Sequence, residues 1–585
     1  MIMKWYGRSA CLSLLLGLLA VPSSFGAIYY VATNGNNGAS GLSTTQAWGS
    51  ISHALLQAVG GDTIRVMPGT YPALPLGIPS AIHLEGSDTY NPQAAPHERH
   101  TSLTFLTLTS TNYAQSAAIT IQSTNVQLSR FTLNGDWNND GIPDVKAGID
   151  SPHRPIEIRQ CHLSTIGGYG IRILGSAPAP LPSDTEFYRC RIIGNTLSNI
   201  LHTNVNSGAG IYLFQAPADC ISNVINSVSG LNSRAGIYLD RCFYTAAMSG
   251  GSRVEANHLD HCTVGVWASM FGYIGESMSI AHNTISNGVI GIRITASRGP
   301  ASILSNQVHV SGWSPSGLTP ARGIWVQADN NPWDPPSMTD HAVSGNEVQG
   351  NATAGDGTAG LCFSYNSSVT DGQNNGVRAT ATWNSASRFD HGVRIETGTN
   401  GVSLPHTPLV EVKFHYNDLF GNQTYGAQTI GFTGTLNAAS NWWGSYSGPT
   451  SPPANPPSPG ILATAWPLGR YTVDTDQDGI RDHLDANDDG DRYNDLQEMY
   501  IGSDPADAAS QFQFEQGTYA SGDGVTLSWR SLTNRLYHIV RSTNLLVAFP
   551  TTTYATVTGA PPTNTWIDPA TPLPPYFYRM SITNP

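Results

Sequence analysis

Residues 280–294 read Ile-Ala-His-Asn-Thr-Ile-Ser-Asn-Gly-Val-Ile-Gly-Ile-Arg-Ile, and this stretch decides the fold. Aliphatic residues alternate with variable ones, which predicts a short strand, a corner and a second short strand. The same pattern returns roughly every thirty residues along the chain, and self-similarity at about 20–50 residues is typical of repeat architectures.

Two markers define the repeat. The first is glycine followed by an aliphatic residue, a variable residue and usually another aliphatic residue. It occurs at Gly148, Gly170, Gly210, Gly236, Gly265, Gly291, Gly323, Gly360 and Gly392. The second is a strand that begins Asn-x-aliphatic. Its first position holds Asn223, Asn257, Asn283, Asn306, Asn346 and Asn417, and we expect Cys161 and Cys190 in the equivalent place of earlier copies.

Stacking of these copies explains the pattern physically. No copy is long enough to bury its own apolar face, so the copies must pile up along a common axis. Glycine allows a bend where a side chain would crowd the turn, and an inward Asn can hydrogen-bond to its equivalent in the next coil. A β-propeller is the main alternative, but it needs antiparallel hairpins with tight turns. We therefore predict an all-β fold, a right-handed parallel β-helix (solenoid) of about ten coils and about 50 Å.

Composition restricts the partners. Among 585 residues only 12 % are charged, lysine occurs only at positions 4, 146 and 413, and the net charge is −13. The sequence contains no basic run or stripe, which disfavours nucleic acid or an anionic membrane as the main partner.

The N-terminus predicts export. Lys4 and Arg8 precede an apolar run at 11–21, and small residues precede Ala27. We interpret 1–26 as a signal peptide cleaved near Gly26-Ala27, with a retained membrane anchor as the alternative. No later apolar stretch has bilayer length, so we expect a secreted or cell-surface protein without membrane insertion.

The rest of the chain divides into four segments. We expect a β-helix at 27–446 with a capping helix at 52–59, a proline-rich linker at 447–472, an acidic segment at 473–510 and an antiparallel β-sandwich at 511–585. Ser50 or Ser52 is the expected cap of the helix. Cys161 and Cys190 are expected to pack as thiols rather than form a disulfide, while Cys220, Cys242, Cys262 and Cys362 stay undecided.

The acidic segment carries the strongest chemical pattern. Calcium prefers six to eight oxygen ligands, which a twelve-residue loop with acids at positions 1, 3, 5, 9 and 12 supplies. One loop holds Asp474, Asp476, Asp478, Asp482 and Asp485, with Gly479 at position 6. A second holds Asn487, Asp489, Asp491, Asp495 and Glu498, but Arg492 replaces its glycine. We predict Ca²⁺ in both, with the second site in question; an acidic solvated linker is the alternative.

A third loop inside the coil is less complete. Asp136, Asn138, Asp140 and Asp144 match, but Ala147 stands in place of the last acid. A calcium site and a loop bonded to itself through its Asx side chains are both open here.

The outward strand positions suggest a binding face. In the glycine copies the variable residue points outward, and stacking places these residues in a column: Asp150, Arg172, Tyr212, Tyr238, Trp267, Arg293, Trp325, Cys362 and Arg394. Two residues further on follow Phe214, Asp240, Ser269, Thr295, Gln327 and Glu396. We predict that Arg172, Tyr212, Tyr238, Trp267, Arg293 and Trp325 bind substrate, since rings offer platforms to sugars and Arg pairs with carboxylates. The alternative is that the rings simply stack on each other.

Catalytic residues are harder to find. Hydrolysis needs two carboxyl groups within about 5–10 Å, and Asp240 and Glu396 should lie too many coils apart. Asp240 could pair instead with a neighbouring acid such as Asp260. A lyase needs a base and a cation, for which the candidates are Arg293, Arg241, Tyr238, His258 and Lys146. His258 and His261 on either side of Asp260 are expected to be strand-surface residues.

Several segments resemble known families. Residues 28–71 resemble the N-terminus of secreted right-handed parallel β-helix proteins, a group that includes the pectate-lyase-like polysaccharide lyases, and 441–449 resembles their terminal segment. The acidic loops resemble thrombospondin type 3 repeats, and 511–585 resembles a fibronectin-III-like module.

These resemblances imply an exported, calcium-binding and monomeric β-helix protein that binds an acidic polysaccharide. Cleavage by β-elimination is the implied reaction. The alternative is a non-catalytic adhesive or surface-structural rod.

Overall fold

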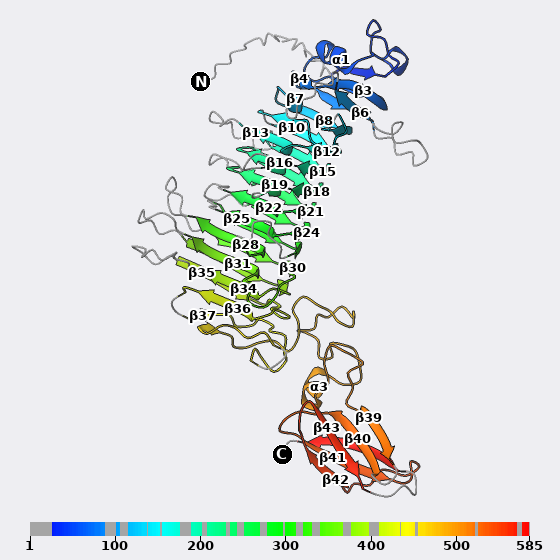
Figure 1. Ribbon diagram of the computed structural model, residues 1–585, viewed down its shortest axis with the longest axis vertical. Coiled ribbons are helices and arrows are strands. Elements are labelled where there is room, and N and C mark those ends of the chain that lie inside the picture. Colours follow the sequence, from blue (N-terminus) through cyan, green and yellow to red (C-terminus); the bar gives the residue numbers. More distant parts are fainter. Residues whose placement is uncertain are drawn as a thin grey trace, which may run out of the picture.

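Three long parallel sheets form a rod in the computed structural model (Figure 1). The structure describes residues 26–87, 101–105, 115–136, 138–152, 155–175, 189–201, 208–229, 234–242, 251–269, 278–295, 299–311, 320–329, 340–366, 376–396, 409–432, 435–450, 454–520, 524–569 and 576–583. The predicted signal peptide lies almost wholly outside these residues. In the part of the chain that is described, no helix combines the length and apolarity that a bilayer crossing demands.

Most coils contribute one strand to each sheet, and every neighbouring pair within the three sheets is parallel. Sheet A contains β1 (Ile28–Val31), β2 (Thr63–Val66), β5 (His83–Glu85), β8 (Val126–Ser129), β11 (Ile156–Arg159), β14 (Cys190–Ile193), β17 (Ala218–Ile221), β20 (Arg253–Glu255), β23 (Met278–Ala281), β26 (Ala301–Leu304), β29 (Asp340–Ser344), β32 (Gly376–Thr382) and β35 (Leu409–His415). Sheet B contains β3 (Gly69–Leu74), β6 (Thr101–Phe105), β9 (Phe131–Asn134), β12 (His162–Ile166), β15 (Thr196–Leu201), β18 (Val224–Ser229), β21 (His258–Cys262), β24 (Thr284–Gly288), β27 (Gln307–Val310), β30 (Glu347–Gln349) and β33 (Ser385–Ser387). Sheet C contains β4 (Leu76–Ile78), β7 (Gln115–Ile121), β10 (Val145–Ser151), β13 (Tyr169–Leu174), β16 (Gly208–Phe214), β19 (Arg234–Asp240), β22 (Val264–Ser269), β25 (Ile290–Thr295), β28 (Arg322–Asp329), β31 (Ala359–Asn366), β34 (His391–Glu396) and β36 (Tyr425–Ile430).

The coil is longer than the repeat markers predict. Sheet A has 13 strands rather than about ten, because the N-terminal coils lack the glycine marker. At a strand spacing of about 4.8 Å, this sheet extends about 60 Å.

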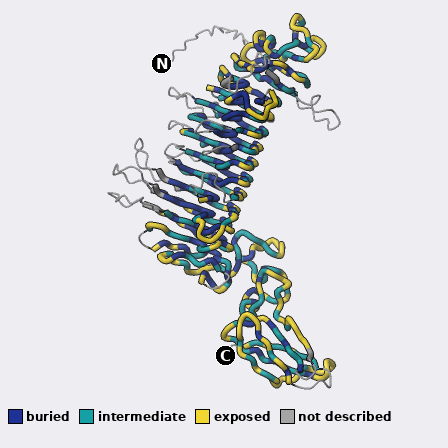
Figure 2. The backbone as a smooth tube through the Cα atoms, viewed as in Figure 1, coloured by how far each residue is buried: buried dark blue, intermediate teal, exposed yellow. Residues whose placement is uncertain are grey.

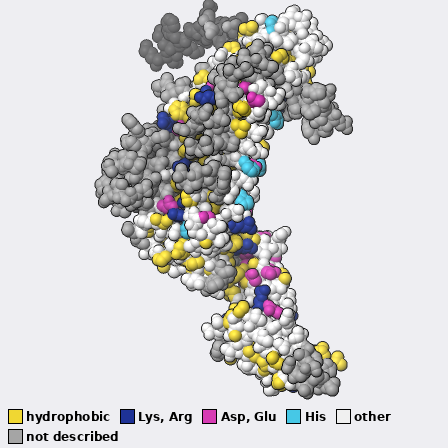
Figure 3. Space-filling model, viewed as in Figure 1, with side chains coloured by type: hydrophobic (Ala, Val, Ile, Leu, Met, Phe, Trp, Pro, Cys, Tyr) yellow, Lys and Arg dark blue, Asp and Glu magenta, His cyan; other side chains and the backbone are white. Residues whose placement is uncertain are grey.

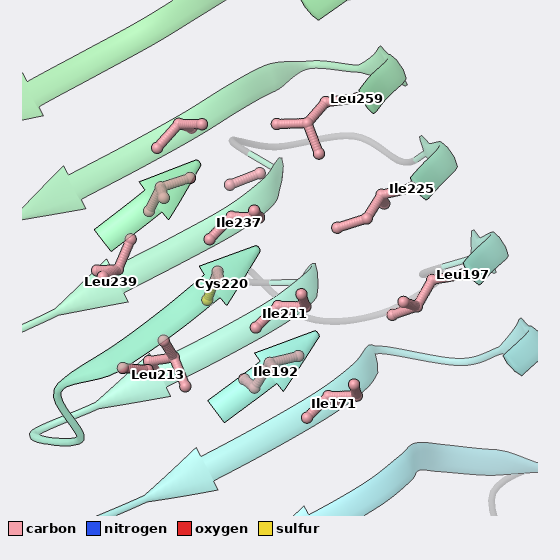
Figure 4. Close-up of a cluster of buried hydrophobic side chains, with 14 of the residues drawn as sticks. Ile171, Ile192, Leu197, Ile211, Leu213, Cys220, Ile225, Ile237, Leu239 and Leu259 are labelled. Atoms are coloured by element: carbon pink, nitrogen blue, oxygen red, sulfur yellow. The ribbon is translucent and has the colours of Figure 1, made fainter. Parts of the chain in front are cut away.

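Inward aliphatic side chains fill the space between the sheets. Ile211, Ile237 and Leu259 are fully buried, and Figure 4 shows such side chains stacked coil on coil. Stretches of buried residues recur in coil after coil along the rod (Figure 2). The predicted single hydrophobic column is therefore confirmed.

An asparagine ladder marks the turn between sheets A and B. It comprises Asn195, Asn223, Asn257, Asn283, Asn306, Asn346, Asn384, Asn417 and Asn441, with each side-chain oxygen accepting hydrogen bonds from the preceding coil. Cys161 occupies the position before Asn195, as predicted. The prediction for Cys190 is wrong, since this residue begins β14 opposite Ala218 in sheet A. Cys161 and Cys190 are thus not equivalent, and both are buried free thiols, like the four other described cysteines.

Both ends of the rod are covered. Helix α1 (Ile51–Gln57) begins after Ser50, whose side chain accepts the His53 N–H, and it buries Ile51, Ala54 and Leu55 at the first coils; the short 3₁₀ turn η1 (Thr44–Gln46) precedes it. At the other end Trp443 is buried in the rod core. The proline-rich segment packs there too, through the parallel pair β37 (Leu436–Asn437) and β38 (Ile461–Leu462).

The C-terminal module consists of two three-stranded antiparallel sheets. One contains β39 (Gln516–Ala520), β40 (Gly524–Arg530) and β43 (Thr563–Asp568); the other contains β42 (Ala555–Thr558), β41 (Leu536–Ser542) and β44 (Phe577–Thr583). Leu527, Trp529, Tyr537 and Ile539 form a core of their own between them. Helix α3 (Asp495–Ile501) precedes this module and carries the end of the second acidic loop.

Candidate functional site

The outward face of sheet C has the register that the repeat predicts. The first column runs Asp150–Arg172–Tyr212–Tyr238–Trp267–Arg293–Trp325–Cys362–Arg394, and each residue is opposite the next in adjacent strands. The second runs Phe214–Asp240–Ser269–Thr295–Gln327–Ser364–Glu396. Long-range stacking therefore gathers residues that lie more than twenty positions apart in the chain.

The aromatic rings of the first column stack on each other. Tyr238 and Trp267 have ring centroids 4.6 Å apart at 13°, and Tyr212 lies 5.3 Å from Tyr238. The guanidinium group of Arg293 lies between two indoles, 4.8 Å from Trp267 and 4.6 Å from Trp325. The ring faces thus contact their neighbours along the rod, as the alternative interpretation expects. A ligand on this face would meet ring edges, hydroxyl groups and guanidinium groups.

Polar groups of the face hold each other in place. Arg172 donates to both carboxylate oxygens of Asp150, at 2.8 and 2.7 Å. The Tyr212 hydroxyl donates to Asp240 Oδ2 at 3.2 Å, and burial raises the pKa of Asp240. A carboxyl with a raised pKa binds a proton more readily, which suits a general base.

The remaining catalytic candidates are not brought together. Burial raises the pKa of Tyr238, so this phenol keeps its proton at neutral pH, and Lys146 is exposed near the start of β10. Asp240 and Glu396 are five rungs apart in sheet C, about 24 Å. That separation confirms that they do not form a hydrolytic pair.

Asp260 belongs to another sheet than Asp240. It lies in β21 of sheet B, where Ser286, Asn287 and His261 bond its carboxylate. Burial opposes these hydrogen bonds, which nevertheless lower the pKa of Asp260 to about 2. The flanking His258 and His261 are exposed on this strand, which confirms the strand-surface interpretation.

The column ends in a charged cluster that the sequence does not reveal. Arg322 and Arg394 both pair with Glu396 and both donate to the Gly357 carbonyl. Cys362 lies between Trp325 and Arg394 in the register and is fully buried, and burial raises its thiol pKa to about 11. Arg322 precedes the glycine marker rather than following it, so the column pattern misses it.

In the acidic segment, carboxylates converge at two points. Oxygens of Asp474, Asp476 and Asp478 lie within 4.8 Å of one another, as do those of Asp489, Asp491 and Glu498. Buried side-chain oxygens of Asn487, Asp489 and Asp491 have no hydrogen-bond donor, and both Glu498 oxygens are buried beside them. Buried oxygens that accept no hydrogen bond from the protein fit a hard cation such as Ca²⁺.

The other predicted ligands have different contacts. Asp482 accepts from the Thr475 N–H and hydroxyl, Asp485 accepts from the Asn487 N–H, and Asp495 accepts from the Asp488 N–H. Arg492 does not adopt positive φ, whereas Gly479 has φ +98°. The second loop therefore closes without the glycine that the pattern requires at position 6.

The third loop is bonded within itself. Asp136 accepts from the Gly141 N–H, and Asn138 donates to Asp140 at 3.0 Å. Among the described residues its acids do not converge as those of the acidic segment do. These contacts agree with the Asx-bonded alternative, and calcium at this loop stays a prediction.

Sheet A and its turns place arginines side by side that are far apart in the sequence and therefore form no basic run there. Arg65, Arg130, Arg159, Arg191 and Arg253 all pair with carboxylates on its outward side. They come from different coils and alternate with the acids that they pair with, so they form a mixed ionic row rather than a basic stripe. On the face shown in Figure 3, basic and acidic side chains are interspersed along the rod.

Comparisons with known proteins agree with this architecture. Residues 117–355 match the family model described as a right handed beta helix region. No curated protein matches the chain significantly.

Solved structures match the chain at low similarity. XylC in complex with xylose has 10 % identity and a TM-score of 0.35, covering 94 % of this chain and 100 % of that one. Pectate lyase Pel9A has 13 % identity and a TM-score of 0.27, covering 76 % and 80 %. The A-module of mannuronan C-5 epimerase AlgE6 from Azotobacter vinelandii has 16 % identity and a TM-score of 0.31, covering 65 % and 93 %. The parallel three-sheet coil and the family match together identify the rod of this chain as a right-handed parallel β-helix.

Proposed function

We propose that this protein is exported and binds an acidic polysaccharide along the outward face of sheet C. The observation that carries the proposal is the unbroken column from Asp150 to Arg394, where arginine, tyrosine and tryptophan side chains are only partly buried. Guanidinium groups pair with carboxylates, and tyrosine hydroxyls and ring edges contact sugar hydroxyl and CH groups. Such a linear array suits a linear glycan.

Cleavage by β-elimination is the reaction that we assign to this face. A base must take the proton from C5, beside the uronate carboxylate, while a cation neutralises that carboxylate. The C4–O bond to the departing sugar breaks as the C4–C5 double bond forms, and the leaving oxygen takes a proton from water. Asp240 is the proposed base because its pKa is raised by burial and Tyr212 orients it. Arg293, two rungs further along the rod, is the proposed carboxylate-binding group.

The test is incubation with pectate, alginate and chondroitin, with and without calcium, while absorbance of the unsaturated product is followed. Asp240→Asn should abolish product formation and leave binding intact, and Arg293→Gln should weaken binding. Arg388→Gln, at an exposed turn of another face, is the matched control. Product from Asp240→Asn at the wild-type rate would remove Asp240 from the mechanism.

The second candidate function is a non-catalytic surface rod. The stacking of Tyr238 on Trp267 and of Arg293 between two indoles favours it, because these contacts stabilise the rod without any ligand. Retained glycan binding without product would indicate a binding rod. Absence of both glycan binding and product would indicate a purely structural rod.

Calcium is the proposed cofactor of the acidic segment. Asn487, Asp489, Asp491 and Glu498 would hold one ion, and Asp474, Asp476 and Asp478 would contribute to another. Calorimetric titration with calcium should detect binding that Glu498→Gln removes at the second site, while Glu515→Gln, an exposed acid of the C-terminal module, leaves it unchanged. No heat and no thermal shift on adding calcium would refute both sites.

Export and the monomeric state complete the proposal. We expect the mature N-terminus at Ala27, which N-terminal sequencing of protein from the culture medium would check. Light scattering should give the mass of a single chain.

A further inference from the structure

The outward side of sheet A presents a regular ionic arrangement in its N-terminal coils. Three acids, Glu85, Glu157 and Asp219, lie in β5, β11 and β17, with one strand of sheet A between successive members. The row therefore has an acid on every second strand of sheet A, and successive acids are about 10 Å apart.

Each acid contacts two arginines. Glu85 accepts from Arg65 at 3.1 Å and from Arg130 at 2.9 Å. Glu157 pairs with Arg159 and, at 3.9 Å, with Arg191. Asp219 pairs with Arg189 at 2.8 Å and with Arg253 at 2.7 Å. We call these groups the Arg–acid–Arg triplets.

The first two triplets have a surplus of positive charge. One carboxylate faces two guanidinium groups, which leaves a net charge of about +1 in each triplet. The third is closer to neutral, because Glu255 lies 4.0 Å from Arg253. The surplus is local, since the chain as a whole carries −13.

A groove runs along the first two triplets. One hollow of about 350 Å³ is lined by Gln127, Glu157, Arg189 and Arg191, among others, and a second of about 390 Å³ by His83, Glu85, Gln127, Arg130, Glu157 and Arg159. Gln127 and Glu157 line both hollows, so the two adjoin, and we refer to them together as the groove. Arg65, Arg130, Arg159 and Arg191 keep 41–48 % of their side chains exposed, and donors remain accessible there.

The lining determines the class of ligand. Asn125, Gln127 and Gln160 offer amide groups for hydroxyls, and the described lining contains no aromatic ring for stacking a base. Guanidinium groups recognise oxyanions. We propose that this groove is a second glycan site, independent of sheet C, that binds oxyanion-bearing sugars of an acidic oligosaccharide at positions about two rungs apart.

The test measures binding of short oligogalacturonates and of dextran sulfate by calorimetry, with neutral xylo-oligosaccharide as the uncharged probe. Arg130→Gln combined with Arg191→Gln should weaken binding about tenfold or more at low salt. Glu157→Gln removes the acid of a triplet and should tighten binding several-fold, a gain that a purely structural ion pair would not produce. The two acidic probes distinguish carboxylate from sulfate.

Arg378→Gln is the matched control. Arg378 pairs with Glu411 at 2.8 Å on the same sheet, far along the rod and outside the groove. It loses one positive charge, half of what the double variant loses and the same as each of the single variants Arg130→Gln and Arg191→Gln, and it should bind like wild type. Thermal melting of every variant separates loss of binding from loss of folding.

The outcomes separate this site from the sheet C proposal. Arg293→Gln should reduce binding to sheet C only, leaving the groove affinity unchanged. If the Arg130/Arg191 double variant binds acidic probes as wild type does, or if Glu157→Gln gives no gain, the groove proposal is overturned while the sheet C site stands.

Discussion

Single asparagines contribute much of the regularity of the rod. Asn283 Nδ2 donates to the Val254 carbonyl at 2.8 Å and to Asn306 Oδ1 at 2.9 Å, while its own Oδ1 accepts from Asn257. Each member thus bonds a main-chain carbonyl and a main-chain N–H of the preceding coil. A buried polar group without such a partner costs about 1–3 kcal/mol.

Asn283→Ala should lower the free energy of unfolding by about 2–4 kcal/mol, because it leaves Asn257 and Val254 groups unpaired inside the rod. Chemical denaturation measures this loss. Asn351→Ala, at an exposed position, should change stability by less than about 0.5 kcal/mol. Equal effects of the two substitutions would contradict a stabilising ladder.

His341 should make stability depend on pH. Burial lowers its pKa from 6.5 to about 4, and its Nδ1 accepts the Ala301 N–H at 3.1 Å. Between these values the unfolded chain binds a proton that the folded chain does not, so stability is full above pH 6.5 and falls as pH drops toward 4.

His341→Asn keeps an acceptor near the Nδ1 position but does not titrate. Its melting temperature should therefore fall less steeply than that of wild type over this pH range. His309→Asn, at an exposed position of β27, should follow the wild-type profile. A profile of His341→Asn parallel to wild type would show that His341 is not the titrating group.

At the scale of the element, glycine allows the coils of sheet C to approach. A Cβ on Gly291 would lie 2.5 Å from the Gly323 carbonyl and 2.2 Å from Val308 Cγ1. None of the repeated glycines of this column has positive φ, so the requirement is space rather than backbone conformation. The predicted bend at these glycines is wrong, because they lie within strands of sheet C, and the crowding that requires them comes from the neighbouring coil.

Gly291→Ala should destabilise the rod by about 1–3 kcal/mol, because backbone of the neighbouring rung must move. Gly60→Ala is the control, since its Cβ would meet nothing closer than 3.9 Å. Denaturant midpoints of both variants provide the comparison. If Gly291→Ala left the free energy of unfolding unchanged, neighbouring strands of sheet C would be able to move apart at little cost.

At the scale of the whole molecule, two hydrophobic cores are joined through the acidic segment. The rod core and the core of the C-terminal module share no residue. Between them, the Tyr446 hydroxyl donates to Asp488 at 2.8 Å, Asp418 accepts from the Tyr471 N–H, and Arg535 donates to the Tyr500 carbonyl. The acidic loops therefore contact both parts.

Scanning calorimetry should resolve two unfolding transitions. We expect calcium to raise the temperature of the C-terminal one by about 5–10 °C and to raise that of the rod by less, because an ion bound only to the folded loops stabilises what they contact and the rod core is the larger of the two. Chelation should reverse the shift, and Glu498→Gln should lose most of it. A single transition insensitive to calcium would contradict this division.

The sequence predicts the rod well because each coil repeats the same local rule. Alternating aliphatic residues and recurring glycines specify stacking, and stacking then gives the register of the sheet C columns from Asp150 to Arg394. Cys190 was misplaced because it resembles Cys161 locally but belongs to another sheet. The C-terminal strands were likewise predictable from the alternation around Trp529 and Tyr537.

The sequence by itself determined the parallel coil, the columns and the acidic loops, since each depends on residues close together or at a constant period. Only the tertiary structure decided that the ring faces of Tyr238 and Trp267 contact each other. It also decided that Asp482 and Asp495 accept hydrogen bonds from the backbone of their loops. Finally, it decided that arginines from separate coils meet around Glu85 and Glu157. These contacts depend on side-chain direction across rungs, and the spacing of residues along a chain does not encode that direction.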